Sequence, residues 1–239
     1  MLRHGAFHIL LLAIFSTASP VHAMVSSRAI SQFVNIDALG MLRRVATQPS
    51  LAVPHLRVAH VGCVDWAALH SGGIRGVVFD KDNTLTAPYV DELADEAVKA
   101  ITTCREVFGS DKLLVMSNSA GGRDDTGWQT ASKVEASLGL EVLRHGKKKP
   151  AGGDELMSWF RDKDEAKDIA PHQLAFVGDR LLTDVVFGNL HGMLTVHVQP
   201  LTVRGDNPAA LVVRSVENRL LLPLLRWKRP PPHPASRQG

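Results

Sequence analysis

Short β-branched runs that alternate with helix-patterned segments constrain the fold of this chain more than any other feature. Five runs are short, apolar and bounded by glycine or polar residues, as buried strands are. These runs are residues 75–79, 112–116, 141–144, 174–177 and 194–198. Between them, residues 90–107, 129–138 and 155–161 carry apolar side chains at helical spacing. Strands that alternate with helices predict an α/β fold with a parallel sheet and helices on both faces.

The bulk composition limits the classes of protein to which the chain belongs. With 239 residues, of which 45% are hydrophobic and 21% charged, it has the size and composition of one globular domain. A net charge of +3 is too small to indicate a nucleic-acid binder, and we expect no nucleic-acid partner. Cys63 and Cys104 form neither a zinc motif nor a disulfide framework, so we expect two buried thiols.

Polar residues stand where four of the predicted strands end. They are Asp80 and Asp82 after the first strand, Ser117 and Asn118 after the second, Lys149 after the third, and Asp179 and Asp184 after the fourth. Ligands of open α/β sheets bind at the carboxyl ends of the strands, so we expect these side chains to converge. Carboxylates, a hydroxyl and an ammonium together suit a divalent cation and a phosphoryl group.

Phosphoryl transfer assigns a role to each carboxylate. Asp80 leaves its strand toward the site and is a suitable nucleophile, which would form an aspartyl-phosphate. Its attack on an anionic phosphate needs a cation, and Mg²⁺ with oxygen ligands supplies that charge. Asp82, where the chain turns, would protonate the leaving oxygen and then activate water. Asp179 is the further metal carboxylate, and Asp184 supports it or the metal's water shell.

The remaining candidates would hold the phosphate. Ser117 and Asn118 can donate hydrogen bonds to its oxygens, and Lys149 provides a fixed positive charge. Each signal alone is weak, because an Asp-x-Asp pair or a lysine run is more often solvated, and Asp179 and Asp184 could simply cap a helix. The order of the motifs, each after a strand-like run, is what makes the joint case for function.

These motifs resemble those of the haloacid dehalogenase (HAD) superfamily over residues 36–222. In chain order the four segments are Asp80-Lys-Asp-Asn-Thr-Leu-Thr86, Val115-Met-Ser117-Asn118, Lys149-Pro150 and Val177-Gly-Asp179-Arg-Leu-Leu-Thr-Asp184. The resemblance implies a Rossmann-like HAD fold, with Asp80 as nucleophile and metal ligand. It also implies that Asp82 is the acid/base and binds the metal through its backbone carbonyl, and that Asp179 binds the metal.

A narrower resemblance is to the phosphatidylglycerophosphate phosphatases of mitochondria and plastids, in HAD subfamily IIIA. It is carried by Ser117-Asn-Ser-Ala-Gly121, by Leu143-Arg-His-Gly-Lys-Lys-Lys-Pro150 and by the upstream segment Pro49-Ser-Leu-Ala-Val-Pro-His-Leu56. It implies dephosphorylation of phosphatidylglycerophosphate to phosphatidylglycerol, on the route to cardiolipin or to thylakoid lipid. Three consecutive lysines make the choice of Lys149 as the phosphate ligand depend on Pro150.

The spacing between the motifs leaves no room for a cap domain. From Asp80 to Ser117, and from Ser117 to Lys149, the chain has space for a helix and a strand only. A site without a lid suits a headgroup presented at a membrane surface better than a small metabolite, which enzymes usually enclose. With the mild basic excess, this predicts a phospholipid substrate and peripheral membrane association.

The two ends of the chain are predicted to lie outside the catalytic domain, which we place at residues 36–228. Residues 1–35 have no acidic side chain, and their apolar run 9–15 is shorter than the roughly 20 residues of a membrane span. They suggest a secretory-type signal, a two-part plastid address or a transit peptide to the mitochondrion (matrix face of the inner membrane) or plastid, unless Met24 is the true start.

At the other end, residues 209–228 are either a packed terminal helix or a membrane-surface contact. Residues 229–239 are predicted to be a Pro-rich, disordered tail without a role in the core.

Two other functions remain open. The first is the same chemistry on a protein, nucleotide or sugar phosphate. The second is a non-catalytic HAD-like scaffold or membrane-binding module, against which the presence of Asp82 argues, since a degenerate member would be expected to lose the nucleophile, the acid or the metal carboxylate.

Overall fold

Six parallel strands form one sheet in the order β1-β6-β5-β2-β3-β4. The structure is a computed structural model that describes residues 44–202, 217 and 227–237. The strands are β1 (Leu56–Val58), β2 (Gly76–Phe79), β3 (Leu113–Val115), β4 (Glu141–Val142), β5 (Leu174–Gly178) and β6 (Leu194–Val198). The predicted α/β fold with a parallel sheet is therefore confirmed.

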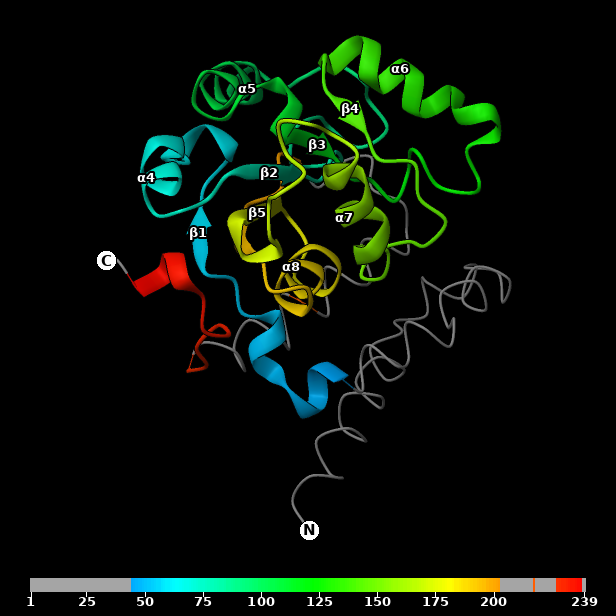
Figure 1. Cartoon of the computed structure of the whole chain (residues 1–239). Helices are drawn as coiled ribbons and strands as arrows, with labels where there is room; N and C mark the ends of the chain where they lie inside the picture. The colour runs from blue at the N-terminus through cyan, green and yellow to red at the C-terminus, as the bar shows by residue number, and fades with distance from the viewer. Residues whose placement is uncertain (1–43, 203–216, 218–226, 238–239) are drawn as a thin grey trace, which may run out of the picture.

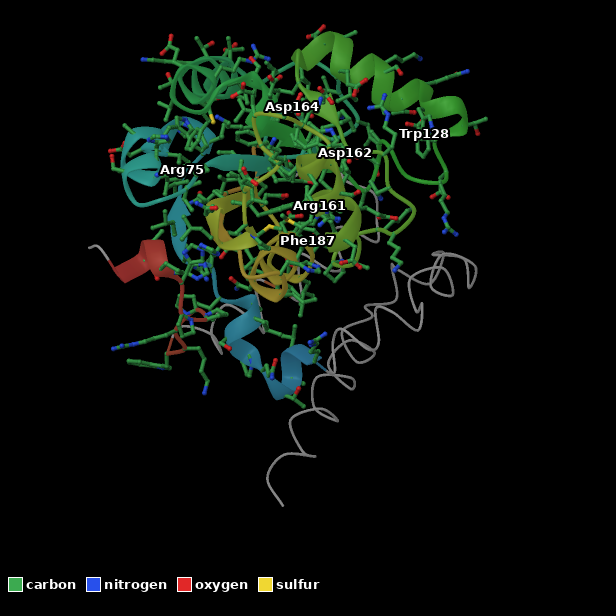
Figure 2. All side chains as sticks on the ribbon, in the orientation of Figure 1. Arg75, Trp128, Arg161, Asp162, Asp164 and Phe187 are labelled. Carbon is green, nitrogen blue, oxygen red and sulfur yellow. The ribbon has the colours of Figure 1, made fainter. Side chains whose placement is uncertain are left out.

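Helices cover both faces of this sheet (Figure 1). They are α4 (Trp66–Ser71), α5 (Asp95–Phe108), α6 (Gln129–Leu138), α7 (Gly153–Arg161) and α8 (Val186–Leu190). Side chains alternate along a strand, and β2 accordingly sends Val77 and Phe79 to one face and Val78 to the other. The first face packs against α4, α5 and α6, and the second against α7 and α8. Phe187 of α8 lies beside α7 in this second layer (Figure 2).

Strongly periodic segments have nearly the predicted bounds. Helix α6 and strand β6 begin and end where they were expected. Helix α5 begins at Asp95, later than predicted, and Val90 and Val98, which we had placed on its apolar face, are 41% and 49% exposed. The residues before α5 form a loop instead, because the N–H of Ala94 donates to the carbonyl of Leu85.

Residues 45–71, for which the sequence predicted no strand or helix, contain β1 and α4. Strand β1 has three residues, two of them exposed, and it lies at the edge of the sheet beside β6. Such a short edge strand has no alternating pattern to detect. Helix α8 was also missed; it follows a single turn of π-helix at Leu181–Val185.

The expectation that the Pro-rich tail has no role in packing is wrong for part of it. His233 is buried, its ring lies 5.2 Å from that of His55, and Ala235 packs against the core on the face of the sheet that α4, α5 and α6 cover. Burial lowers the pKa of His233 to about 4. The predicted presequence, 1–35, and most of residues 209–228 lie outside the described part of the chain.

Cys104 is buried as expected, but Cys63 is exposed, which corrects the prediction of two buried thiols. Within residues 44–202, 217 and 227–237, no helix is both long and apolar enough to cross a membrane.

No cap domain separates the motifs. Between Asp80 and Ser117 the chain forms α5 and β3, and between Ser117 and Lys149 it forms α6 and β4, all of them described. The predicted absence of a cap at these two positions is confirmed.

Candidate active site

Three buried carboxylates meet at the carboxyl end of the sheet. Asp80 follows β2, Asp179 follows the neighbouring strand β5, and Asp184 lies in the π-helical turn after β5. One oxygen of each lies within 4.8 Å of the others. A Cβ at Gly178 would come within 2.5 Å of Asp184 Oδ2, so a glycine here allows Asp184 to lie against the end of β5. The sequence predicted Asp184 as a supporting group, and the structure places it inside the cluster.

Lys149 joins this cluster from the loop after β4. Its Nζ is 2.6 Å from Asp80 Oδ1 and 2.7 Å from Asp184 Oδ1. Lys149 is buried, whereas Lys147 and Lys148 are exposed. Of the three consecutive lysines, Lys149 is therefore the one that points into the site, as predicted from Pro150.

The charges of these four side chains do not balance. Burial raises the pKa of Asp80 to about 8, against the effect of Lys149, and the carboxylates of Asp184 and Asp179 add to the rise. Burial alone would lower the pKa of Lys149, but Asp184 and Asp80 outweigh it and the pKa is raised, so the ammonium is retained. Three carboxylates beside one ammonium are a donor set that fits a divalent cation with hard oxygen ligands, such as Mg²⁺.

Ser117 and Asn118 lie beside this cluster, after β3. Ser117 is fully buried, and its Oγ is 2.9 Å from Ser119 Oγ. Asn118 Oδ1 accepts a hydrogen bond of 2.8 Å from the backbone N–H of Lys149. That bond ties the second motif to the third and leaves the NH₂ group of Asn118 as its possible donor to a phosphate.

Asp82 is outside the buried trio, and its side chain is 22% exposed. Three donors hold its carboxylate: Lys81 Nζ at 3.1 Å, the N–H of Tyr89 at 3.1 Å and Ser119 Oγ at 2.5 Å. Lys81 also donates to the carbonyl of Val90 at 2.7 Å. Sequence reasoning missed Lys81 and Ser119, although both stand next to predicted site residues.

The comparison with known families decides where the chain belongs. The model of the mitochondrial PGP phosphatase family matches residues 36–202, which include every residue of the site. The chain belongs to this family. The matched range also covers all six strands of the sheet.

Curated relatives of this PGP phosphatase family member come from an alga, a plant and a yeast. Phosphatidylglycerophosphate phosphatase 1, chloroplastic, of Chlamydomonas reinhardtii is 46% identical over 170 residues, which are 70% of this chain and 60% of the relative. Phosphatidylglycerophosphate phosphatase 1, chloroplastic/mitochondrial, of Arabidopsis thaliana is 39% identical over 84% of this chain and 56% of the relative. Phosphatidylglycerophosphatase GEP4, mitochondrial, of Saccharomyces cerevisiae is 31% identical over 78% of this chain and 99% of the relative. The chain thus spans somewhat more than half of the algal and plant relatives and nearly all of the yeast one.

Proposed function

We propose that this chain is a Mg²⁺-dependent phosphatase that converts phosphatidylglycerophosphate and water to phosphatidylglycerol and phosphate. One observation carries the proposal: a buried cluster of Asp80, Asp179, Asp184 and Lys149 lies within the region that matches the PGP phosphatase family. The names of the three relatives, all of them phosphatidylglycerophosphate phosphatases, supply the substrate.

Two carboxylates carry the reaction. A carboxylate oxygen of Asp80 attacks the phosphorus and forms an aspartyl-phosphate, while the bond from phosphorus to the lipid's glycerol oxygen breaks. Asp82 gives its proton to that leaving oxygen. It then takes a proton from water, whose oxygen attacks the phosphorus, so that phosphate leaves and Asp80 is restored. The three donors around Asp82 keep its carboxylate in one place for both steps.

The other site residues would bind the phosphate and the metal ion. Lys149, Ser117 and the NH₂ group of Asn118 would bind the phosphate oxygens. Asp80, Asp179 and the backbone carbonyl of Asp82 would hold Mg²⁺, with Asp184 supporting them. When bound, the ion supplies the positive charge that offsets repulsion between the Asp80 carboxylate and the phosphate.

A lipid substrate agrees with the open architecture. No cap domain interrupts the motifs, so a headgroup at a bilayer surface can reach the site without leaving the membrane. We infer peripheral association with a membrane of the mitochondrion or plastid, the organelles that the relatives' names give. In this scheme residues 1–35 are the presequence and residues 36–228 the catalytic domain.

The substrate is tested by comparing phosphate esters. We expect phosphate release from phosphatidylglycerophosphate in mixed micelles to exceed that from glycerol phosphate and an aryl phosphate by at least 10-fold in kcat/KM, since the acyl chains place the headgroup at the site (~1.4 kcal/mol per tenfold change). Equal rates for the lipid and the two soluble esters, or a preference for a phosphopeptide, nucleotide or sugar phosphate, would contradict the lipid assignment and keep the chemistry.

Ser119→Ala should lower kcat about 10-fold and leave KM within about twofold. The reason is that Asp82 loses one of its three donors, and a hydrogen bond to a charged group contributes roughly 1.5 kcal/mol or more. Steady-state kinetics beside Ser110→Ala, an exposed serine before β3, provide the check. A raised KM with an unchanged kcat would mean that Ser119 acts through Ser117 on phosphate binding and not through Asp82.

A further inference from the structure

His145 is a buried histidine that the proposed reaction does not use. It lies in the loop between β4 and Lys149 and is 2% exposed. Its Nε2 is 2.8 Å from the backbone carbonyl oxygen of Ser117, and its Nδ1 is 2.8 Å from that of Lys147. The ring therefore lies between the two segments that carry the proposed phosphate ligands.

Both contacts of the ring are with groups that can only accept hydrogen bonds. A carbonyl oxygen has no hydrogen to give, so each ring nitrogen needs its own N–H to make a bond. A neutral imidazole has one N–H, and its second nitrogen would direct a lone pair at a carbonyl oxygen. An imidazolium has two N–H groups and satisfies both contacts.

Two hydrogen bonds with backbone donors also connect these two segments. The N–H of His145 donates to the carbonyl of Gly121, and the N–H of Lys149 donates to Asn118 Oδ1, both at 2.8 Å. These bonds align the two loops. The contact of the imidazole with the Ser117 carbonyl is the one that reaches Ser117 itself, two residues before Ser119.

Charged groups of both signs belong to the adjoining segments. The carboxylate of Asp125 accepts from the N–H of Gly121, and Glu155 Oε1 of α7 accepts from the N–H of Gly146, which follows His145. The guanidinium of Arg123 lies beside Gly146, and the ammonium groups of the lysine run follow on the same loop. Carboxylates and cations are therefore both present on the segments that adjoin the ring, and Arg144 directly precedes His145.

We propose that His145 is a positioning residue that holds the Ser117 segment against the Lys147–Lys149 segment by donating both ring N–H groups as an imidazolium. The inference deepens the proposed function and rests on it in one respect, namely that Ser117 and Lys149 bind the same phosphate. By fixing Ser117 relative to Lys149, the ring sets the distance between two donors that lie far apart in the sequence.

The charge on the ring is tested on the wild-type protein by ¹⁵N NMR of the histidine side chains at pH 7. The His145 signals are assigned by their loss in His145→Gln. The inference predicts that both ring nitrogens have the chemical shift of an N–H nitrogen. One nitrogen with the shift of an unprotonated ring atom would overturn the imidazolium.

The positioning role is tested with two variants that each keep one bond. The side-chain amide of His145→Gln can replace Nε2 at Ser117, and that of His145→Asn can replace Nδ1 at Lys147. Affinity for inorganic phosphate is measured by calorimetry with Mg²⁺ present, beside the melting temperature, and the exposed His172→Gln is the control. We expect both variants to bind phosphate about 10-fold more weakly and the control to match the wild type.

The outcomes separate this inference from the proposed substrate. A lower melting temperature with unchanged phosphate affinity would show that His145 only stabilises the fold and would overturn the positioning role. If the wild type released no phosphate from phosphatidylglycerophosphate, while the variants still weakened phosphate binding, the substrate would be wrong and the role of His145 would stand.

Discussion

Asp80→Asn should abolish phosphate release from phosphatidylglycerophosphate, by on the order of 10⁴-fold or more in kcat, without unfolding the protein. An amide is a poor nucleophile toward phosphorus, so no aspartyl-phosphate forms at this position. Asparagine has nearly the same shape, and one hydrogen bond to Lys149 can be kept. The measurement is single-turnover phosphate release, with Asp111→Asn, an exposed aspartate before β3, as the control.

The same variant should change how stability depends on pH when the metal is chelated. Without a cation, the pKa of Asp80 is raised to about 8, mainly by burial, whereas the unfolded chain has an aspartate pKa of about 3.9. At a pH between these two pKa values, the folded state therefore keeps a proton that the unfolded state has lost. Stability from this group is fully present below pH ~4 and is lost as pH rises through ~8.

Thermal unfolding in EDTA tests the direction of this change of stability with pH. The melting temperature of the wild type should fall further between pH 6 and pH 9 than that of Asp80→Asn, which has no proton to lose at this site. Parallel curves for the two proteins would show that Asp80 is not the group that titrates there.

Lys149→Met should be the most destabilising of the site substitutions and should also reduce kcat/KM by on the order of 10³-fold. Methionine fills a similar volume but leaves the carboxylates of Asp80 and Asp184 buried without their partner. Removing one member of a buried ion pair typically costs about 3–5 kcal/mol. Urea denaturation in EDTA measures this cost.

Lys148→Met is the matched control, because it removes the same charge from the adjacent residue. The side chain of Lys148 is 56% exposed and pairs with an exposed carboxylate, Asp124. Its loss should change stability by no more than about 1 kcal/mol and leave kcat/KM unchanged. Equal effects at 148 and 149 would mean that the run acts through its net charge and not through one buried ammonium.

Sequence patterns predicted those parts of the fold that depend on periodicity. Buried strands such as β5 and β6 and the amphipathic helix α6 are long enough to show it. Strand β1 is stabilised by pairing with β6 at the sheet edge, a contact between residues far apart in the sequence. The packing of His233 against His55 is equally non-local, and composition alone predicted a tail without a role in the core.

The residues of the candidate site, too, were only partly predicted from the sequence. The rule that ligands gather at the carboxyl ends of parallel strands was enough to bring Asp80, Asp179 and Lys149 together. It could not find residues that act through another residue. Ser119 and His145 depend on side-chain directions within turns, and a strand pattern contains no information about those directions.

Phosphate release from phosphatidylglycerophosphate in mixed micelles, with Mg²⁺ and then with EDTA, tests the central claim most directly. Asp80→Asn and Asp82→Asn are assayed in parallel. The account predicts release by the wild type that needs Mg²⁺ and is lost in both variants. Release that persists in EDTA or in Asp80→Asn, or no release from the lipid by a protein that hydrolyses an aryl phosphate with Mg²⁺, would contradict it.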